Sequence, residues 1–124
     1  MRLLLDTHVI LWWLGNAPRL ASDLMTRLET EPETFVSAVS VWEVSIKQAL
    51  GKLKERANLA GAISERGFRE LPVTFRHAVA VRGVPPHHKD PFDRMLIAQA
   101  RAENLTIVTH DRRFESYDVP LLLA

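Results

Sequence analysis

Acidic residues at separated points of this 124-residue chain are the side chains best suited to carry out chemistry. The stretch HKDPFDRMLIAQA places Asp90 and Asp93 around Pro91, just before an apolar helical run. Proline favours the first position of a helix, so Asp90 is well placed to cap that helix. Asp93 falls at the third helical position, where a reciprocal capping partner would be Glu or Gln. We therefore predict that Asp93 is the chemical residue of the pair.

Three further acids occupy positions from which they could reach the same site. Asp6 follows the apolar run RLLL and Asp111 follows TIVTH, so each comes at the end of a predicted strand. Taken alone, either residue could be an ordinary turn or capping aspartate. Glu43 lies near the start of a predicted helix, where Ser40-x-x-Glu43 also fits a capping box. The sequence therefore offers each acid a structural role beside a chemical one.

Convergence of these acids would define a particular chemistry. Carboxylates that share a small space must take up protons or a neutralising cation. Ligation by oxygen alone selects Mg²⁺ or Mn²⁺ over zinc. Such an ion lowers the pKa of an attacking water and offsets negative charge during phosphodiester hydrolysis. The sequence leaves open whether one ion or two would bind.

The elements that must position the acids alternate between strand and helix. This alternation predicts one α/β domain over residues 1–124 with a mainly parallel sheet, whose ligands bind at the carboxyl ends of the strands. Within the helix that begins at Ser40, apolar spacing predicts that Val41, Val44, Ile46 and Leu50 point inward. We predict strands over 2–6, 34–37, 68–74 and 105–111, an edge strand within 117–124, and helices over 7–15, 20–30, 40–53, 55–66, 75–84 and 91–103.

Composition excludes several classes of protein. The chain has no cysteine, which rules out disulfides and thiolate zinc sites. No apolar run is long enough for a membrane span or a signal peptide, so we expect a cytoplasmic protein. Residues 1–43 contain three Lys or Arg against six Asp or Glu, whereas residues 44–113 contain thirteen against seven. The basic excess fits either a surface that holds a polyanion or ordinary solvated helix faces.

The acids lie in four blocks, LLLDTHVILWWL, SAVSVWEVSIKQALGKL, DPFDRMLIAQA and LTIVTHDRRF. In order and spacing, these blocks resemble a PIN domain, specifically the VapC ribonucleases of toxin–antitoxin pairs, over nearly the whole chain. The resemblance implies a three-layer fold with a five-stranded, mainly parallel sheet flanked by helices. It also implies a homodimer that is blocked by a VapB-like antitoxin. The implied activity is that of a Mg²⁺- or Mn²⁺-dependent endoribonuclease toxin that cuts structured RNA, such as transfer or ribosomal RNA, with a metal-activated water.

The resemblance also assigns roles to residues of this chain. Asp6, Glu43 and Asp93 match the first three acids of the family, which are metal ligands. Asp111 matches the fourth acid, and Thr109 matches a hydroxyl residue often found in the same loop. Asp90 is an additional acid, which either helps to bind metal or only caps the helix. Nearby basic residues that could contact RNA phosphates are Lys47, Arg94, Arg112 and Arg113.

Aromatic residues beside the acids have several possible roles. Either Trp12 or Trp13 is expected to pack inward while the other faces a dimer or antitoxin surface, although both could lie in the core. Metal ligation by a histidine such as His8 or His110 would favour zinc or manganese, but hydrogen bonding is the more ordinary role.

Two other functions compete with the ribonuclease. A phosphatase of the haloacid-dehalogenase type would need D-x-D after the first strand, where this chain has DTH, so we discount it. A catalytically silent module that binds RNA or an antitoxin through the same fold remains the alternative.

Overall fold

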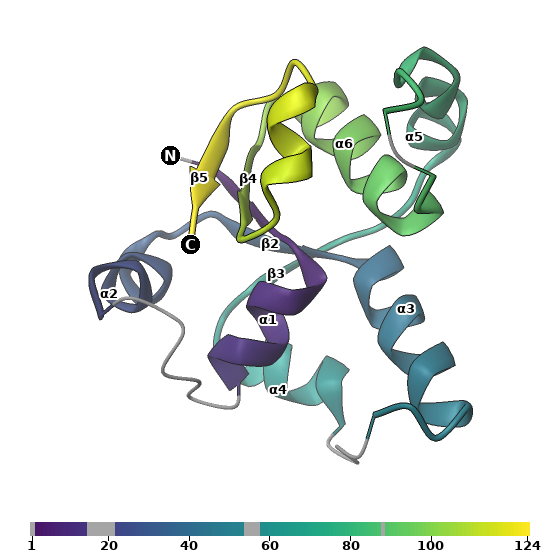
Figure 1. Cartoon of the computed structure of the whole chain (residues 1–124). Helices are drawn as coiled ribbons and strands as arrows, with labels where there is room; N and C mark the ends of the chain where they lie inside the picture. Colours follow the sequence, from purple (N-terminus) through teal and green to yellow (C-terminus); the bar gives the residue numbers. More distant parts are fainter. Residues whose placement is uncertain (1, 15–21, 54–57, 88) are drawn as a thin grey trace.

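The computed structural model of the chain, which describes residues 2–14, 22–53, 58–87 and 89–124, is built around a five-stranded sheet (Figure 1). The spatial order of the strands is β3-β2-β1-β4-β5, and all four neighbouring pairs are parallel. The prediction of an α/β fold with a mainly parallel five-stranded sheet is therefore confirmed. The strands are β1 (Leu3–Leu5), β2 (Thr34–Ser37), β3 (Arg69–Leu71), β4 (Thr106–Thr109) and β5 (Leu121–Leu123).

Helices cover both faces of the sheet. Successive residues of a strand point to opposite faces, so Leu3 and Leu5 join one apolar cluster while Leu4 joins the other. The first cluster receives side chains from α1, α2 and α4, and the second receives more of its side chains from α6 than from any other element. The helices are α1 (Thr7–Leu14), α2 (Ser22–Thr30), α3 (Ala38–Ala49), α4 (Leu59–Glu65), α5 (Phe75–Ala80) and α6 (Pro91–Glu103), with 3₁₀ turns η1 (Val81–Gly83) and η2 (Arg112–Ser116).

Most predicted elements are found, with shifted ends. The predicted helix over 91–103 and the predicted strand over 34–37 have the bounds of α6 and β2. The strand expected over 68–74 is shorter, because Pro72 follows Leu71 and cannot donate a backbone hydrogen bond to the sheet. The strand expected over 105–111 ends at Thr109. Parts of three predicted helices, at residues 15, 20–21 and 55–57, lie outside the described residues.

The start of α3 differs from the prediction in a way that affects Glu43. The helix begins directly after β2, and the Ser37 side chain accepts a hydrogen bond from the Val39 N–H at 3.0 Å. The predicted capping box of Ser40 and Glu43 is therefore wrong, because Ser37 reaches the free N–H groups first. Ser40 lies inside the helix, where its hydroxyl accepts from the Thr7 hydroxyl at 2.9 Å. Glu43 consequently has no capping role.

Two predicted orientations in this part of the fold have different outcomes. Val44 of α3 is buried as predicted, and Val41 and Ile46 are half-buried. The prediction is wrong for Leu50, which is 63% exposed because it lies beyond the last turn of the helix, at its C-cap. Trp13 of α1 is buried and its ring contacts that of Phe68, which confirms that one tryptophan of the pair packs inward. Trp12 is half-buried.

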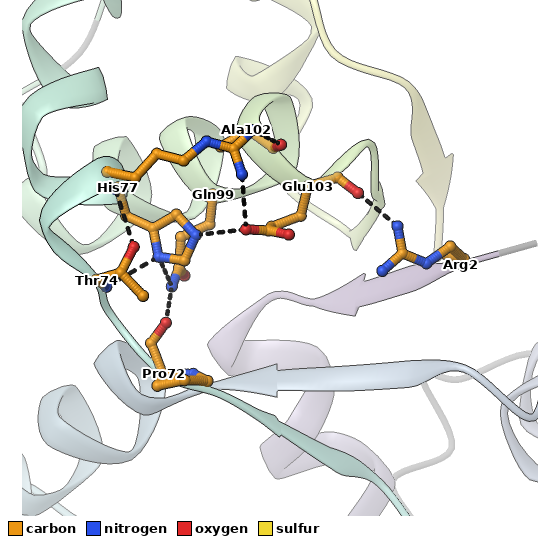
Figure 2. A network of polar contacts seen from close by, with 8 residues as sticks. Arg2, Pro72, Thr74, His77, Gln99, Ala102 and Glu103 are labelled. Carbon is orange, nitrogen blue, oxygen red and sulfur yellow. Dashed lines mark hydrogen bonds and ion pairs between the residues drawn. The ribbon is translucent and has the colours of Figure 1, made fainter.

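A polar network around the buried side chain of His77 joins α5 to the C-terminal end of α6 (Figure 2). The His77 ring is 1% exposed, and its Nδ1 accepts from the Thr74 backbone N–H at 3.1 Å. Nδ1 therefore carries no proton, so Nε2–H donates to the Glu103 carboxylate at 3.0 Å. The Thr74 hydroxyl in turn accepts from the His77 N–H, which completes a capping box that uses histidine in the usual Glu or Gln position. Arg76 and Arg2 donate to the last carbonyls of α6, those of Ala102 and Glu103, each at 2.6 Å.

Within the described part of the chain, no helix has both the length and the apolar character needed to cross a membrane.

Candidate active site

Two adjacent strand ends bring Asp6 and Thr109 together. β1 and β4 pair in parallel with Leu5 opposite Val108, so the next residue of each strand lies at the same edge of the sheet. The Thr109 hydroxyl donates to Asp6 Oδ2 at 2.8 Å, and both side chains are buried. The same hydroxyl accepts from the Asp111 N–H at 3.0 Å. Thr109 therefore fixes the orientation of the Asp6 carboxylate and links it to the loop that carries Asp111.

The first turn of α6 brings Asp93 to this edge. Asp90 Oδ1 accepts from the N–H groups of Phe92 and Asp93, at 2.9 and 3.2 Å. This confirms that Asp90 caps the helix and that Pro91 occupies its first turn. Asp93 is only 8% exposed, an uncommon state for an aspartate near a helix start. Its chemical role remains a prediction.

The pKa of Asp93 reflects both its burial and the charge of the neighbouring acids. That pKa is raised from its ordinary value of 3.8 to about 8. Burial is the largest cause, because removing a carboxylate from water disfavours its charged form. Repulsion from the other acids of the proposed site adds to it, in the order Asp6, Asp90, Glu43 and Asp111.

Asp6 experiences opposing influences at the end of β1. Burial raises the pKa of its carboxyl group most strongly. The hydrogen bond from Thr109, the charge of His8 and the Thr7 N–H all lower it, and repulsion by Glu43 raises it again. The carboxyl groups of Asp6, Glu43 and Asp93 therefore interact electrostatically although they come from β1, α3 and α6.

Glu43 reaches the site from the second turn of α3. Its side chain is 8% exposed, and Oε2 accepts from Lys47 Nζ at 3.0 Å. Lys47 follows four residues later, the spacing at which helical side chains meet. This spacing is readable in the sequence, so the pair could have been anticipated. Lys47 therefore already neutralises part of the negative charge of the site.

Asp111 lies at the rim of the site and also has a structural role. Its carboxylate accepts from the Arg113 N–H at 2.9 Å and caps η2. The Arg113 guanidinium donates to both carboxylate oxygens, from Nε to Oδ1 at 3.1 Å and from Nη2 to Oδ2 at 2.7 Å. The reading of Asp111 as a turn aspartate is therefore confirmed, and its role as fourth acid remains a prediction.

The remaining basic candidates differ in how far they are engaged within the protein. Arg94 donates to the backbone carbonyls of Val84 and Pro85, at 2.9 and 3.0 Å, and so holds the chain that leads to α6. The Arg112 side chain is 77% exposed and pairs with Glu115 at 3.2 Å. Of these two arginines, Arg112 is the more accessible to a nucleic acid.

The donor set fits a hard divalent cation. In the part of the chain that the structure describes, no three His, Asp or Glu side chains already form a metal-binding cluster. The acids that do gather supply only oxygen ligands, the type that Mg²⁺ and Mn²⁺ prefer. The pKa values of Asp6 and Asp93 are raised mainly by burial, and repulsion among the acids adds to that effect, so a bound cation would favour their ionised forms. Asp6, Glu43 and Asp93 are the residues that could hold such an ion.

An open cleft of about 430 Å³ lies beside two acids of the proposed site. Asp6 and Asp111 line one part of it, and aromatic rings line another. No local pattern in the sequence predicts that these rings share one wall. The residues that line the cleft are Asp6, His8, Trp12, His110, Asp111 and Arg112.

Comparison with known proteins agrees with the fold. The PIN domain family matches residues 3–120. The ribonuclease VapC22 of Mycobacterium tuberculosis (strain ATCC 25618 / H37Rv) is 32% identical over an alignment that covers 94% of this chain and 92% of that protein.

Solved structures share the same architecture at lower identity. The crystal structure of DNA-bound VapBC from Salmonella typhimurium matches with a TM-score of 0.73 and 20% identity, over 98% of this chain and 97% of that chain. The crystal structure of VapBC2 from Rickettsia felis, bound to a promoter DNA fragment, matches with a TM-score of 0.72 and 14% identity, over 99% and 98%. The chain therefore belongs to the PIN-domain family, as a homologue of a VapC ribonuclease.

Proposed function

We propose that this protein is a metal-dependent endoribonuclease and the toxin of a VapBC-type toxin–antitoxin pair. The observation that carries the proposal is the buried Asp93 carboxyl group, whose pKa of about 8 reflects burial beside Asp6, Asp90, Glu43 and Asp111. A fold gains nothing in stability from gathering like charges in this way, so a cation is the natural occupant. The homologous VapC22 is itself named a ribonuclease.

Each acid of the proposed site has a distinct task. Asp6, Glu43 and Asp93 would hold Mg²⁺ or Mn²⁺, and Asp111 would act from the rim. When bound, such an ion supplies a water of lowered pKa and offsets charge on the phosphate. Thr109 orients Asp6 through its 2.8 Å hydrogen bond. Asp90 positions Asp93 by capping the first turn of α6.

Basic side chains near the acids would hold the RNA backbone. Arg112 is the foremost candidate, because it lines the cleft and is largely exposed. Lys47 would release Glu43 when a cation binds and could then reach a phosphate. Arg94 would contribute least, since its guanidinium already donates to two carbonyl groups.

The biological setting follows from the same proposal. We expect a cytoplasmic homodimer that is held inactive by a VapB-like antitoxin, with transfer or ribosomal RNA as possible substrates. The solved structures of VapBC from Salmonella typhimurium and VapBC2 from Rickettsia felis, matched above, make an antitoxin the first partner to seek.

Cleavage of RNA by purified protein tests the proposed chemistry. The wild type, Asp6→Asn and Asp118→Asn are incubated with RNA in Mg²⁺, in Mn²⁺ and in EDTA. Asp118 is an exposed aspartate, so its substitution is a matched control for the change of Asp to Asn. We expect metal-dependent cleavage by the wild type and by Asp118→Asn, and none by Asp6→Asn.

Two results would contradict this expectation. Cleavage that persists in EDTA and in Asp6→Asn would exclude the metal mechanism. Binding of RNA without cleavage by any preparation would favour the catalytically silent module.

A further inference from the structure

The cleft beside the acids has an aromatic wall formed by Trp12, His8 and His110. The ring centroids of Trp12 and His110 are 5.1 Å apart, with an edge-to-face angle of 73°. The centroid of the His8 ring lies 6.3 Å from that of Trp12, and the two rings are tilted by 42°. Three planar side chains from two separate segments therefore meet at one place.

Both segments hold their rings at the cleft for identifiable reasons. His8 and Trp12 are four residues apart on α1 and so share one face of the helix, while Trp13 points into the core. His110 directly follows β4, and its Nδ1 lies 3.1 Å from the Ala124 carbonyl oxygen, which ties the ring to the end of β5. The wall is thus built on the same two strand ends that position Asp6 and Thr109.

We propose that this wall stacks against an unpaired base of the RNA, next to the phosphate that is cut. The inference rests on the proposed ribonuclease function and assigns the rings of Trp12, His8 and His110 to the binding of one base beside the cut. Proteins read single-stranded RNA by stacking its bases on Trp, His and other planar side chains, whereas A-form duplexes keep their bases inaccessible. Stacking needs no particular hydrogen-bond pattern, so the wall would accept several bases.

The shape and charge of the cleft favour a nucleotide as its occupant. Its volume of about 430 Å³ falls in the range of small-ligand sites, roughly 300–1,000 Å³. Asp6 and the rings line the same cleft, so a base on the wall would place a neighbouring phosphate toward the acids. Arg112, also in the lining, offers a cation to that backbone. These features match a nucleotide more closely than an apolar protein side chain.

A substitution of Trp12 combined with a change in the RNA tests the proposal. One RNA has an unpaired cleavage site, and a second lacks only the base beside the cut while keeping its ribose and phosphate. Wild type, Trp12→Leu and Trp12→Phe are compared, with Phe75→Leu as a control at a 92% exposed aromatic residue on α5. Removal of the base should lower wild-type kcat/KM by about 5- to 100-fold, the usual effect of losing one stacked base.

If Trp12 stacks on the base, Trp12→Leu and removal of the base abolish the same contact, so their effects on kcat/KM should not add. Trp12→Leu should lose a similar factor on the intact RNA and then lose less than about twofold more on the abasic RNA, because the same contact is already gone. Trp12→Phe should keep most of the base dependence, and Phe75→Leu should behave as the wild type. The proposal is overturned if removal of the base harms Trp12→Leu as much as the wild type. It is also overturned if Trp12→Leu weakens only the binding of an antitoxin.

A binding measurement separates this inference from the proposed function. Affinities for both RNAs are measured with Ca²⁺ in place of Mg²⁺, by anisotropy of labelled RNA, so that no cleavage is needed. A base dependence that disappears in Trp12→Leu supports the wall even if the wild type cleaves no RNA in Mg²⁺ or Mn²⁺. Cleavage by the wild type without any such dependence, in binding or in rate, supports the nuclease and rejects the wall.

Discussion

The two ends of α6 hold carboxylates in opposite electrostatic states. Asp93, in the first turn, has a pKa raised to about 8 by burial and by the repulsion of neighbouring acids. Glu103, the last residue of the helix, has a pKa held below its usual value by the hydrogen bond from His77, with Arg76 adding to the effect. At Glu103 the protein provides the opposing charge, whereas at Asp93 it assembles more negative charge than it balances. This contrast separates an end of α6 that stabilises the fold from the end at which we propose that a cation binds.

Neutralising each of these carboxylates should separate activity from stability most sharply. Asp93→Asn should lower ribonuclease activity by more than about 100-fold, since even partners of metal ligands are worth about 10- to 100-fold. Glu103→Gln makes the equivalent change at the other end of α6 and should leave kcat/KM within about twofold per folded molecule. The measurement is initial-rate cleavage of one RNA at saturating Mg²⁺, with folded protein quantified by circular dichroism.

The contrast between the two ends would fail in either of two ways. Activity retained by Asp93→Asn would remove Asp93 from the proposed site and leave Asp90 as the acid to test. A large loss of activity in Glu103→Gln, with intact folding, would mean that the stabilising end of α6 also controls the chemistry.

Removal of the His77 ring should give the largest loss of stability. The ring is fully buried and hydrogen-bonded at both nitrogens, so His77→Ala leaves the Thr74 N–H without its partner and opens a cavity. We expect a loss of about 2–3 kcal/mol in the free energy of unfolding, or roughly 10 °C in Tm for a domain of this size. Thermal unfolding of His87→Ala, which removes an exposed histidine, should change Tm by about 2 °C or less. An equal effect of the two substitutions would mean that the network contributes no stability.

The pH dependence of stability should also distinguish the two ends. The folded-state pKa of Asp93 exceeds its unfolded value, so the folded protein binds more protons between pH 4 and about pH 8. Stability of the metal-free wild type should therefore fall as pH rises through this range. Asp93→Asn should flatten the slope and raise Tm at pH 8.5 by several degrees, although the raised pKa of Asp6 leaves part of the slope in place.

Glu103 should show the opposite dependence. Its pKa is lowered in the folded state, so its stabilising effect is present above about pH 4.5 and is lost as the pH falls below that value. The difference in stability between the wild type and Glu103→Gln should therefore shrink as the solution becomes acidic.

Saturating Mg²⁺ should flatten the slope of wild-type stability against pH between pH 5 and 8.5, because a bound cation favours the ionised form of Asp93. A wild-type profile without a slope in metal-free buffer would contradict the raised pKa.

Local patterns in the sequence predict the strands and helices better than they predict the contacts between side chains. Alternating apolar runs and helical spacing depend on local patterns, which explains why β2 and α6 have their predicted bounds. The spacing of Ser40 and Glu43 predicts a capping box because such a pattern depends only on the distance along the sequence. In the structure the chain passes directly from β2 into α3, so Ser37 caps the helix three residues earlier. The box at Thr74 was missed because histidine replaces the usual Glu or Gln. The aromatic wall joins α1 to the residue after β4, which no local pattern can reveal.

The pair of Lys47 and Glu43 offers the smallest and most informative perturbation. As an i,i+4 pair with a 38% exposed lysine, it should contribute only about 0.3–0.5 kcal/mol, so Lys47→Met should shift Tm by about 2 °C or less. The lysine competes with a cation for Glu43, and its removal should lower the Mg²⁺ concentration for half-maximal activity by about two- to fivefold, the equivalent of roughly 0.5–1 kcal/mol.

The same substitution tests whether Lys47 contacts RNA once Glu43 binds metal. Loss of one phosphate contact should weaken RNA binding for all sequences alike and reduce the slope of log affinity against log salt by about one. Lys47→Arg keeps the charge and should preserve that slope. A lower Mg²⁺ concentration for half-maximal activity, with an unchanged salt slope, would mean that Lys47 only balances the charge of Glu43. Lys47 would then act at the acid cluster as Arg76 acts at Glu103, as a partial counter-ion. Only at the acid cluster would a metal ion replace it.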